Sequence, residues 1–256
     1  MNTFRELFDN LREFTVAVGA VTWFLLRMLG HLPRALARPT LIIEQIYNSG
    51  ALSLVIIMIC GVFIGAVVGL NGYDVLQRFG AEESLGVGAA FALLKELGPV
   101  VTALLFAGRA GTALASEIGL MRATDQLSAM EMMAVDPVLR VAVPRFIGGT
   151  VSLPLLAMIF IGIGLFGVQL VAVQQLGVDA ASFWSQMRGA ISVDDVTDGV
   201  VKSCVFGVAC SLIAVYEGYT AIPTAEGVGR ATTRTVVISA VLVLMLNYML
   251  TAVMLR

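Results

Sequence analysis

Five long apolar segments dominate this chain and set the limits on its fold. They cover roughly residues 51–73, 86–107, 146–173, 199–216 and 236–255. A helix needs about 20 predominantly apolar residues to cross the hydrocarbon core of a bilayer, and each segment is close to that length. Of the chain, 58% is hydrophobic and only 13% is charged, against about 45–50% and about 25% in soluble globular proteins. The sequence therefore predicts an all-α integral membrane protein with five transmembrane helices.

Basic residues are distributed unevenly between the two sides of these segments. Eleven arginines fall on the side that holds the amino terminus: Arg5, Arg12, Arg27, Arg34, Arg38, Arg109, Arg122, Arg140, Arg145, Arg230 and Arg234. The opposite side holds only Arg78, Arg188 and Arg256. Because loops rich in basic residues remain on the cytoplasmic side, we expect the amino terminus to be cytoplasmic and the carboxyl terminus to lie outside.

The first 50 residues form a separate region. Their apolar run, residues 14–26, is only 13 residues long, which is too short to span a bilayer without tilting. Charged residues alternate at helical spacing with an apolar face made of Phe4, Leu7, Phe8, Leu11 and Phe14, a pattern typical of a helix in the headgroup region. We therefore expect an interfacial helix. The alternative, a sixth span, would reverse the orientation that the basic residues favour.

A polar segment, residues 107–145, separates the second and third apolar segments. It mixes both signs of charge with apolar residues at roughly helical spacing, which is typical of an amphipathic helix. Pro137 lacks a backbone donor and disfavours helical geometry at Asp136, so we expect this helix to cover about residues 113–136. It is either an ordinary cytoplasmic connector or a docking surface. In the second case, the residues expected to contact a partner are Glu117, Arg122, Asp125 and Glu131.

Charged residues also lie inside the apolar segments. Lys95 and Glu96 are adjacent in the second segment, and because neighbours on a helix point about 100° apart, each needs its own polar partner. They line a polar pathway or form buried ion pairs. Pro99 cannot donate to the carbonyl of Lys95, which predicts a kink or a loosened turn there. In the fourth segment Lys202 follows Asp198 by one turn, and we expect its ammonium to extend to the membrane boundary.

The first apolar segment carries two further patterns. Gly61, Gly65 and Gly69 form a row of small residues that lets another helix approach closely, within the chain or in a second copy. The outer end of the segment is apolar but contains interspersed polar residues, which suits an amphiphile with tails against side chains and a head near a polar rim. The predicted lipid contacts are Val68, Leu70, Tyr73, Val75, Leu76 and Phe79. Ordinary packing between spans is the alternative.

Several kinds of site are excluded by the residues that the chain lacks. Its only lysines, Lys95 and Lys202, are not part of a GxxxxGK[ST] phosphate loop, so we expect no nucleotide site of that type. His31 is the single histidine, which argues against a Ser-His dyad and a histidine-based zinc site. The cysteines have no metal-ligand spacing and are interpreted as small apolar residues. We therefore expect no cofactor on this chain and a supply of energy through a partner.

The chain contains four distinctive stretches: LSLVIIMICGVFIGAVVGLNGY, LLKELGPVVTALLFAGRAGTALASEIGLMRATDQLSAMEMMAVDP, PRFIGGTVSLPLL and GYTAIPTAEGVGRATTRTVV. Together they resemble the MlaE/YrbE permeases of the Mce-linked lipid ABC transporters, from about residue 40 to the end. The resemblance implies a permease domain over residues 51–256 in the inner membrane of a Gram-negative bacterium. It also implies a role in phospholipid transport that maintains outer-membrane lipid asymmetry.

The resemblance further implies a set of partners and residue roles. The partners are a second copy of the chain, an MlaF-like ATPase that binds ATP and magnesium, an MlaB-like STAS protein and a periplasmic MlaD-like Mce hexamer, with no nucleic acid. The helix expected over residues 113–136 would couple the permease to the ATPase. Some relatives carry Arg where this chain has Lys95. From the cost of a charge inside the bilayer, we expect that, if Lys95 and Glu96 line a cavity of the dimer, Lys95 offers a cation to a lipid phosphate and Glu96 holds a neighbouring helix. An ATPase-independent transporter or channel, and a structural membrane scaffold, remain as alternatives.

Overall fold

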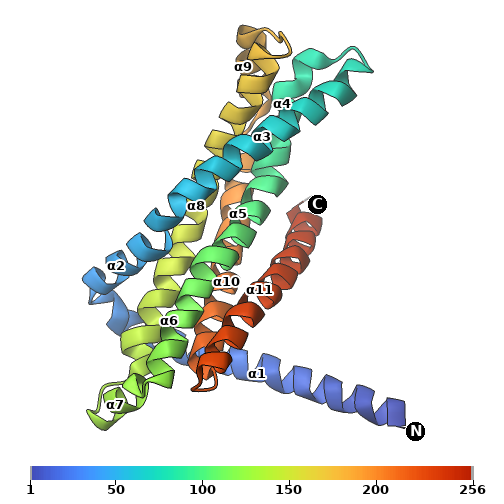
Figure 1. Ribbon diagram of the computed structural model, residues 1–256. Coiled ribbons are helices and arrows are strands. Elements are labelled where there is room, and N and C mark those ends of the chain that lie inside the picture. Colours follow the sequence, from blue (N-terminus) through green and yellow to red (C-terminus); the bar gives the residue numbers. More distant parts are fainter. Residues whose placement is uncertain (1, 255–256) are drawn as a thin grey trace.

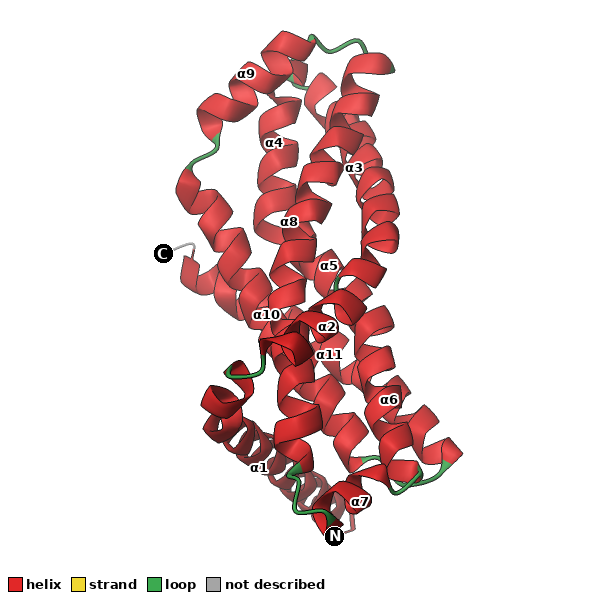
Figure 2. Ribbon diagram, turned by 90° about the vertical axis from the view of Figure 1, so that its left-hand side faces the viewer, coloured by secondary structure: helices red, strands yellow, loops and turns green. Residues whose placement is uncertain are grey.

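The computed structural model describes residues 2–254, and all of the regular structure in that range is helical (Figure 2). Five helical stretches are long and apolar enough to cross a membrane: Pro39–Gln77, Glu82–Ala123, Val138–Gln174, Val193–Thr220 and Ala225–Met254. The predicted all-α membrane fold with five spans is therefore confirmed. Each span is longer than its apolar segment because polar residues at the ends continue the same helix.

Most spans are built from several consecutive helical elements. The first consists of α2 (Pro39–Ser49), η1 (Ala51–Ser53) and α3 (Leu54–Gln77). The second consists of η2 (Glu82–Ser84), α4 (Leu85–Phe91), η3 (Ala92–Leu97), α5 (Gly98–Phe106), η4 (Ala107–Gly111) and α6 (Thr112–Ala123). The third consists of η5 (Val138–Ala142) and α8 (Val143–Gln174), while α10 (Val193–Thr220) and α11 (Ala225–Met254) are the fourth and fifth. The connecting helices are α7 (Gln126–Met132) and α9 (Ala180–Ala190).

The row of small residues in α3 packs along α8 of the same chain (Figure 1). A Cβ atom added to Gly65 would lie 2.0 Å from the carbonyl oxygen of Gly164, and one added to Gly167 would lie 2.4 Å from that of Val62. Real Cβ atoms do not approach other atoms so closely, so both positions require glycine. Of the two packing partners left open by the sequence, the structure shows the one within the chain.

Helix α1 (Asn2–Leu36) lies across one end of the bundle, and its amino-terminal part projects away from it (Figure 1). The ring of Phe24 anchors α1 by packing against Tyr216 and Tyr219 of α10, with centroid distances of 5.7 and 5.3 Å. α1 is not among the five candidate spans. The side chains of the predicted apolar face lie outside the described residues: Phe4, Leu7, Phe8, Leu11 and Phe14.

The polar segment 107–145 differs from the single helix predicted over residues 113–136. Its first part continues the second span through η4 and α6 to Ala123. Asp125 then has a left-handed backbone conformation, with φ of 56°, which a right-handed helix cannot contain but an aspartate tolerates. α7 is a separate helix that ends at Met132. The Asp136 carboxylate accepts a hydrogen bond from the backbone N–H of Val138 at 2.9 Å, at the start of the third span.

Candidate functional site

The second span is interrupted by a π-helical turn, η3, which contains Lys95 and Glu96. Pro99 follows in the first turn of α5 and supplies no N–H to the carbonyl of Lys95. That carbonyl instead accepts a hydrogen bond from Lys202 Nζ of α10, at 2.7 Å. The loosened turn predicted at Lys95 is therefore present, and a side chain from another span satisfies its free backbone oxygen.

Lys202 is buried, with 2% of its surface exposed. Besides the Lys95 carbonyl, its ammonium donates to Glu96 Oε1 at 2.9 Å and to Thr251 Oγ1 at 2.8 Å. An ammonium has three N–H donors, and all three are used within the protein. The expectation that Lys202 extends to the membrane boundary is therefore wrong. The Glu96 carboxylate, the Lys95 carbonyl and the Thr251 hydroxyl offset the cost of removing this charge from water.

Glu96 connects three spans. Its Oε1 also accepts a hydrogen bond from the Thr251 hydroxyl at 2.9 Å, and its Oε2 accepts one from Asn247 Nδ2 at 2.8 Å. Asn247 and Thr251 are one turn apart on α11, whereas Lys202 lies on α10. Nothing in our reading of the sequence singled out these two α11 residues, although their spacing of four inside an apolar span is a visible signal.

Lys95 turns the other way and pairs with Asp195 at the start of α10. The Lys95 Nζ lies 2.7 Å from Asp195 Oδ1, and 5.4 Å from the centroid of the Phe91 ring. Asp195 also accepts hydrogen bonds from the backbone N–H and the hydroxyl of Ser192, which form a capping box at this helix end. Lys95 is thus a paired cation. Its side chain is nevertheless 39% exposed, so one side of the ammonium remains accessible.

These residues surround a cavity of about 250 Å³ between η3, α10 and α11. It is lined by Phe91, Lys95, Glu96, Asp198, Lys202, Thr251 and Met254. The lining combines charged groups with the apolar surfaces of Phe91 and Met254, as a site for an amphiphile requires. The volume is below the range of roughly 300–1,000 Å³ for drug-sized ligands, so this cavity can receive a headgroup but not a whole phospholipid. We refer to Lys95, Glu96, Asp195, Lys202, Asn247 and Thr251 as the charge network.

The structure does not bring the predicted lipid contacts of the first span into this cavity. Three of the six, Val68, Tyr73 and Leu76, pack against the hydrophobic core. The other three are on the surface, with exposed fractions of 46% for Leu70, 54% for Val75 and 80% for Phe79. Of the residues predicted to contact lipid, only Lys95 lines the cavity.

The four predicted coupling residues also fall into two groups. Glu117 pairs with Arg145 at 3.3 Å, and Arg122 donates to the carbonyl of Tyr219. Both residues therefore contact another span, although the Glu117 side chain is 50% exposed. Asp125, just before α7, and Glu131, in the last turn of α7, are both exposed.

Two methionines next to Glu131 are among the most exposed apolar side chains described, with exposed fractions of 85% for Met132 and 68% for Met133. We refer to Asp125, Glu131, Met132 and Met133 as the α7 tip. It combines apolar side chains with acidic neighbours and occupies the end of the bundle farthest from α9 (Figure 1).

Comparison with known proteins gives a consistent set of relatives. The family described as Permease MlaE matches residues 42–253. The chain is 49% identical over 255 residues to the intermembrane phospholipid transport system permease protein MlaE of Haemophilus influenzae, a match that covers 99% of this chain and 98% of that protein. It is 36% identical over 239 residues to a probable ABC transporter permease protein of Rickettsia conorii, covering 93% and 92% of the two chains. A probable ABC transporter permease protein of Synechocystis is 33% identical over 212 residues, with coverages of 83% and 81%.

Proposed function

The chain belongs to the MlaE permease family, and we propose from this premise that it is the membrane-spanning subunit of an ABC-type phospholipid transporter. In this role it moves phospholipid between the bacterial inner membrane and periplasmic Mce carrier proteins, and so maintains outer-membrane lipid asymmetry. The observation that carries the proposal is the 49% identity to the Haemophilus permease over almost the whole of both chains.

The proposal includes an orientation and a set of partners. The excess of arginines at the α7 end supports a cytoplasmic location for that end and for the amino terminus, with a periplasmic carboxyl terminus. The partners are a second copy of the chain, an MlaF-like ATPase, an MlaB-like STAS protein and an MlaD-like Mce hexamer. ATP and magnesium are bound by the ATPase, and this chain carries no cofactor.

The α7 tip is the surface proposed to dock on the ATPase. Exposed apolar side chains surrounded by polar residues are typical of the energetically important centre of an interface. Met132 and Met133 form such a centre beside Glu131. The second span continues from η3 to the end of α6, and α7 follows it after the turn at Asp125. A displacement of the tip that is passed across this turn to α6 therefore reaches the charge network along the second span.

The cavity beside Lys95 is the proposed headgroup site. The ammonium is held by Asp195 but is still partly exposed, so a lipid phosphate can compete with the carboxylate for it. Glu96 and Lys202 satisfy each other and keep α10 and α11 against η3. In this proposal Lys95 contacts the lipid, whereas the Glu96–Lys202 pair maintains the shape of the cavity.

The experiment is reconstitution of the full complex into liposomes, with transfer of fluorescent phospholipid to the periplasmic carrier measured with and without ATP. We expect ATP-dependent transfer that is reduced in Lys95→Met, while the complex assembles normally. Lys95→Arg, which retains the charge, should preserve more transfer than Lys95→Met. Transfer that proceeds equally without ATP would instead identify an ATPase-independent transporter. Normal transfer by Lys95→Met would show that this cavity is not the headgroup site.

A further inference from the structure

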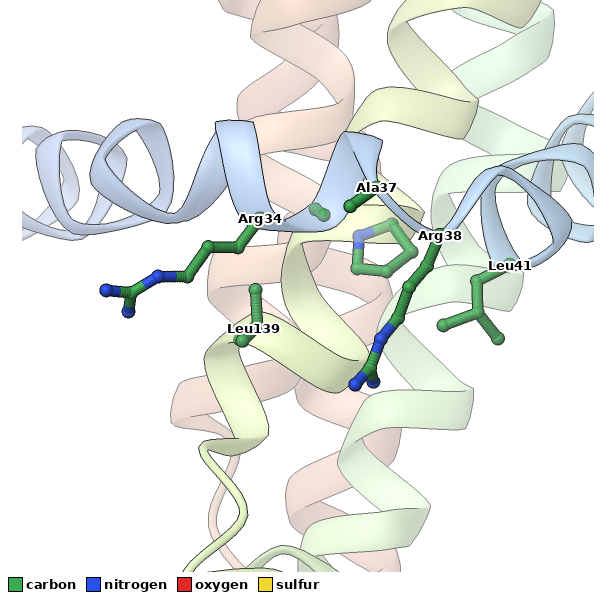
Figure 3. Close-up of a pocket in the computed structure, with 7 residues that line it drawn as sticks. Arg34, Ala37, Arg38, Leu41 and Leu139 are labelled. Carbon is green, nitrogen blue, oxygen red and sulfur yellow. The ribbon is translucent and has the colours of Figure 1, made fainter.

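A second cavity, of about 330 Å³, lies where α1 meets α2 (Figure 3). Residues from α1, α2, η5 and α8 and from the short link between α1 and α2 line it: Arg34, Ala35, Ala37, Arg38, Leu41, Leu139 and Pro144. It is separate from the cavity beside Lys95 and shares no lining residue with it. The two arginines are the only polar side chains in its lining.

The basic residues along this part of the chain differ in their counter-ions. Arg27 and His31 share the carboxylate of Asp136, at 3.6 and 3.2 Å. Within residues 2–254, as far as their side chains are described, Arg34 and Arg38 form no ion pair. Two guanidinium groups at one cavity without a carboxylate produce a positive potential that favours an anionic ligand.

The shape of the cavity narrows the choice of anion. In the view of Figure 3 both arginine side chains extend below the α1–α2 junction, Arg34 to the left and Arg38 downward, with Leu139 between them. A guanidinium group presents a planar set of donors that matches the oxygens of a phosphate. The remaining wall, including Leu41, Leu139 and Pro144, is apolar and suits the glycerol and the first methylene groups of a lipid.

The position of the cavity also suits a lipid. The first span begins at Pro39, immediately after Arg38. Ile43 and Tyr47, further along α2, are 63% and 60% exposed, so exposed apolar side chains follow the two arginines within a few residues, with one exposed acid, Glu44, between the two apolar residues. A phospholipid has the same sequence of polarity from headgroup to tails.

We propose that this cavity binds the phosphate group of a phospholipid from the leaflet at the α7 end, with Arg34 and Arg38 on the phosphate. Such a lipid would be resident rather than transported, and it would fix α1 to the start of the first span. The proposal does not depend on which lipid the permease moves or on whether it moves one.

The test measures binding to the full chain, purified and delipidated in a neutral detergent. Phosphatidylglycerol is titrated, its apparent Kd is obtained by native mass spectrometry, and amide hydrogen exchange of residues 33–41 reports binding at the cavity itself. Two further ligands distinguish a lipid headgroup from a free phosphate compound. Diacylglycerol has the tails without the phosphate, and glycerol phosphate has the phosphate without the tails.

The variant is Arg34→Ala/Arg38→Ala, and the matched control is Arg12→Ala/Arg230→Ala, which removes two exposed arginines from α1 and α11. We expect the double variant to raise the apparent Kd for phosphatidylglycerol about 30-fold, from the usual contribution of two basic residues near an anionic lipid surface. The control should change it little. Phosphatidylglycerol should slow exchange at residues 33–41 in the unmodified chain and in the control, but not in the variant.

Other outcomes overturn the proposal. If the variant and the control bind phosphatidylglycerol with equal affinity, the two arginines do not bind the lipid. If diacylglycerol protects residues 33–41 as well as phosphatidylglycerol does, the phosphate is not what the cavity recognises. Protection by glycerol phosphate at the same concentration as the lipid would identify a free phosphate as the ligand and not a lipid. If the alanine variant does not fold, Arg34→Lys/Arg38→Lys replaces it and keeps both charges. We expect phosphatidylglycerol to protect residues 33–41 less in this variant because lysine cannot make the bidentate contact, and equal protection would contradict that contact. Because the readout is local exchange, failure of the proposed transport function would leave it unchanged.

Discussion

The charge network and the α7 tip contain residues of similar kinds in opposite situations. In the network, Lys202 is almost fully buried and every donor of its ammonium has an acceptor in the chain. At the tip, Glu131 is exposed beside two methionines that are mostly accessible. Polar groups that are completely satisfied stabilise one arrangement of the helices, whereas an exposed apolar patch with acidic neighbours is suited to a partner. Changes in the network should therefore affect stability, and changes at the tip should affect binding.

The largest effect is expected from Lys202→Met. This change leaves the Glu96 carboxylate without its cation and the Lys95 carbonyl without its donor. Removal of one partner from a buried pair typically costs about 3–5 kcal/mol, and we expect the lower end of that range because the Glu96 side chain is 40% exposed and solvent screens part of the charge. Denaturant unfolding in detergent would measure the loss. The double variant Glu96→Gln/Lys202→Met, which removes both charges, should recover much of it. Arg230→Ala breaks the exposed pair with Glu226 and serves as the control, with an expected loss of at most about 1 kcal/mol. Equal losses in Lys202→Met and Arg230→Ala would contradict a stabilising network.

The next largest effect is expected at the α7 tip, where a substitution should change the affinity for the ATPase. Glu131→Lys should weaken association with the partner ATPase by about 2–5 kcal/mol, the usual cost of disrupting a desolvated charge pair. Its unfolding free energy should stay within about 0.5 kcal/mol of the original, as for most surface substitutions. Titration of the purified permease with the ATPase measures this affinity. Asp125→Lys should act similarly, and Glu226→Lys, an exposed acid on α11, is the control. Unchanged ATPase affinity in both tip variants would assign coupling to another surface.

A smaller loss of stability is expected from Gly65→Ala. The new methyl group would lie 2.0 Å from the Gly164 carbonyl oxygen, so α3 and α8 must separate, and overpacking of this kind costs about 1–3 kcal/mol. Gly162→Ala in α8 is the matched control because a Cβ there meets nothing within 4 Å. Thermal unfolding of the two variants side by side is the measurement. If Gly65→Ala unfolds no earlier than Gly162→Ala, the close approach of these helices is not required.

The smallest effect is expected from Ser192→Ala at the edge of the network. It removes the hydroxyl of the capping box at the start of α10, and loss of an N-cap side chain typically costs about 1 kcal/mol. Ser185→Ala in α9 removes an exposed hydroxyl bonded only to the Ser182 carbonyl, and its unfolding midpoint should stay unchanged. Since Ser192 also positions Asp195, the variant should reduce transport slightly as well. An unchanged unfolding midpoint in Ser192→Ala would show that the cap adds nothing to the network.

The number and type of the spans could be predicted from the sequence because the length of an apolar segment is a local property. The partners of the charged residues could not. Glu96 and Lys202 are 106 residues apart, and only the packing of η3 against α10 brings them together. The position of Lys202 along its own helix predicts a side chain at the membrane boundary, but its acceptors lie on η3 and α11.

The polar segment 107–145 shows a second limit of sequence analysis. Its helical spacing was visible, but the left-handed residue that separates α6 from α7, Asp125, and a second one just after α7, Ala134, leave that spacing almost unchanged. Asparagine, aspartate and glycine are the residues that adopt this conformation most readily, so the break at Asp125 was permitted by the sequence but not specified by it.

The contact between α3 and α8 determines where this protein can change shape. Gly65 and Gly164 meet backbone to backbone, so at this point no side chain can change its rotamer to let the helices slide past each other, and we expect α3 and α8 to move together. α11 is held to its neighbours differently, through the Asn247 amide and the Thr251 hydroxyl. Such hydrogen bonds can be exchanged for water or for a headgroup one at a time. For entry of a ligand larger than the cavity beside Lys95, we therefore expect the fifth span to be displaced while the first and third spans remain in contact.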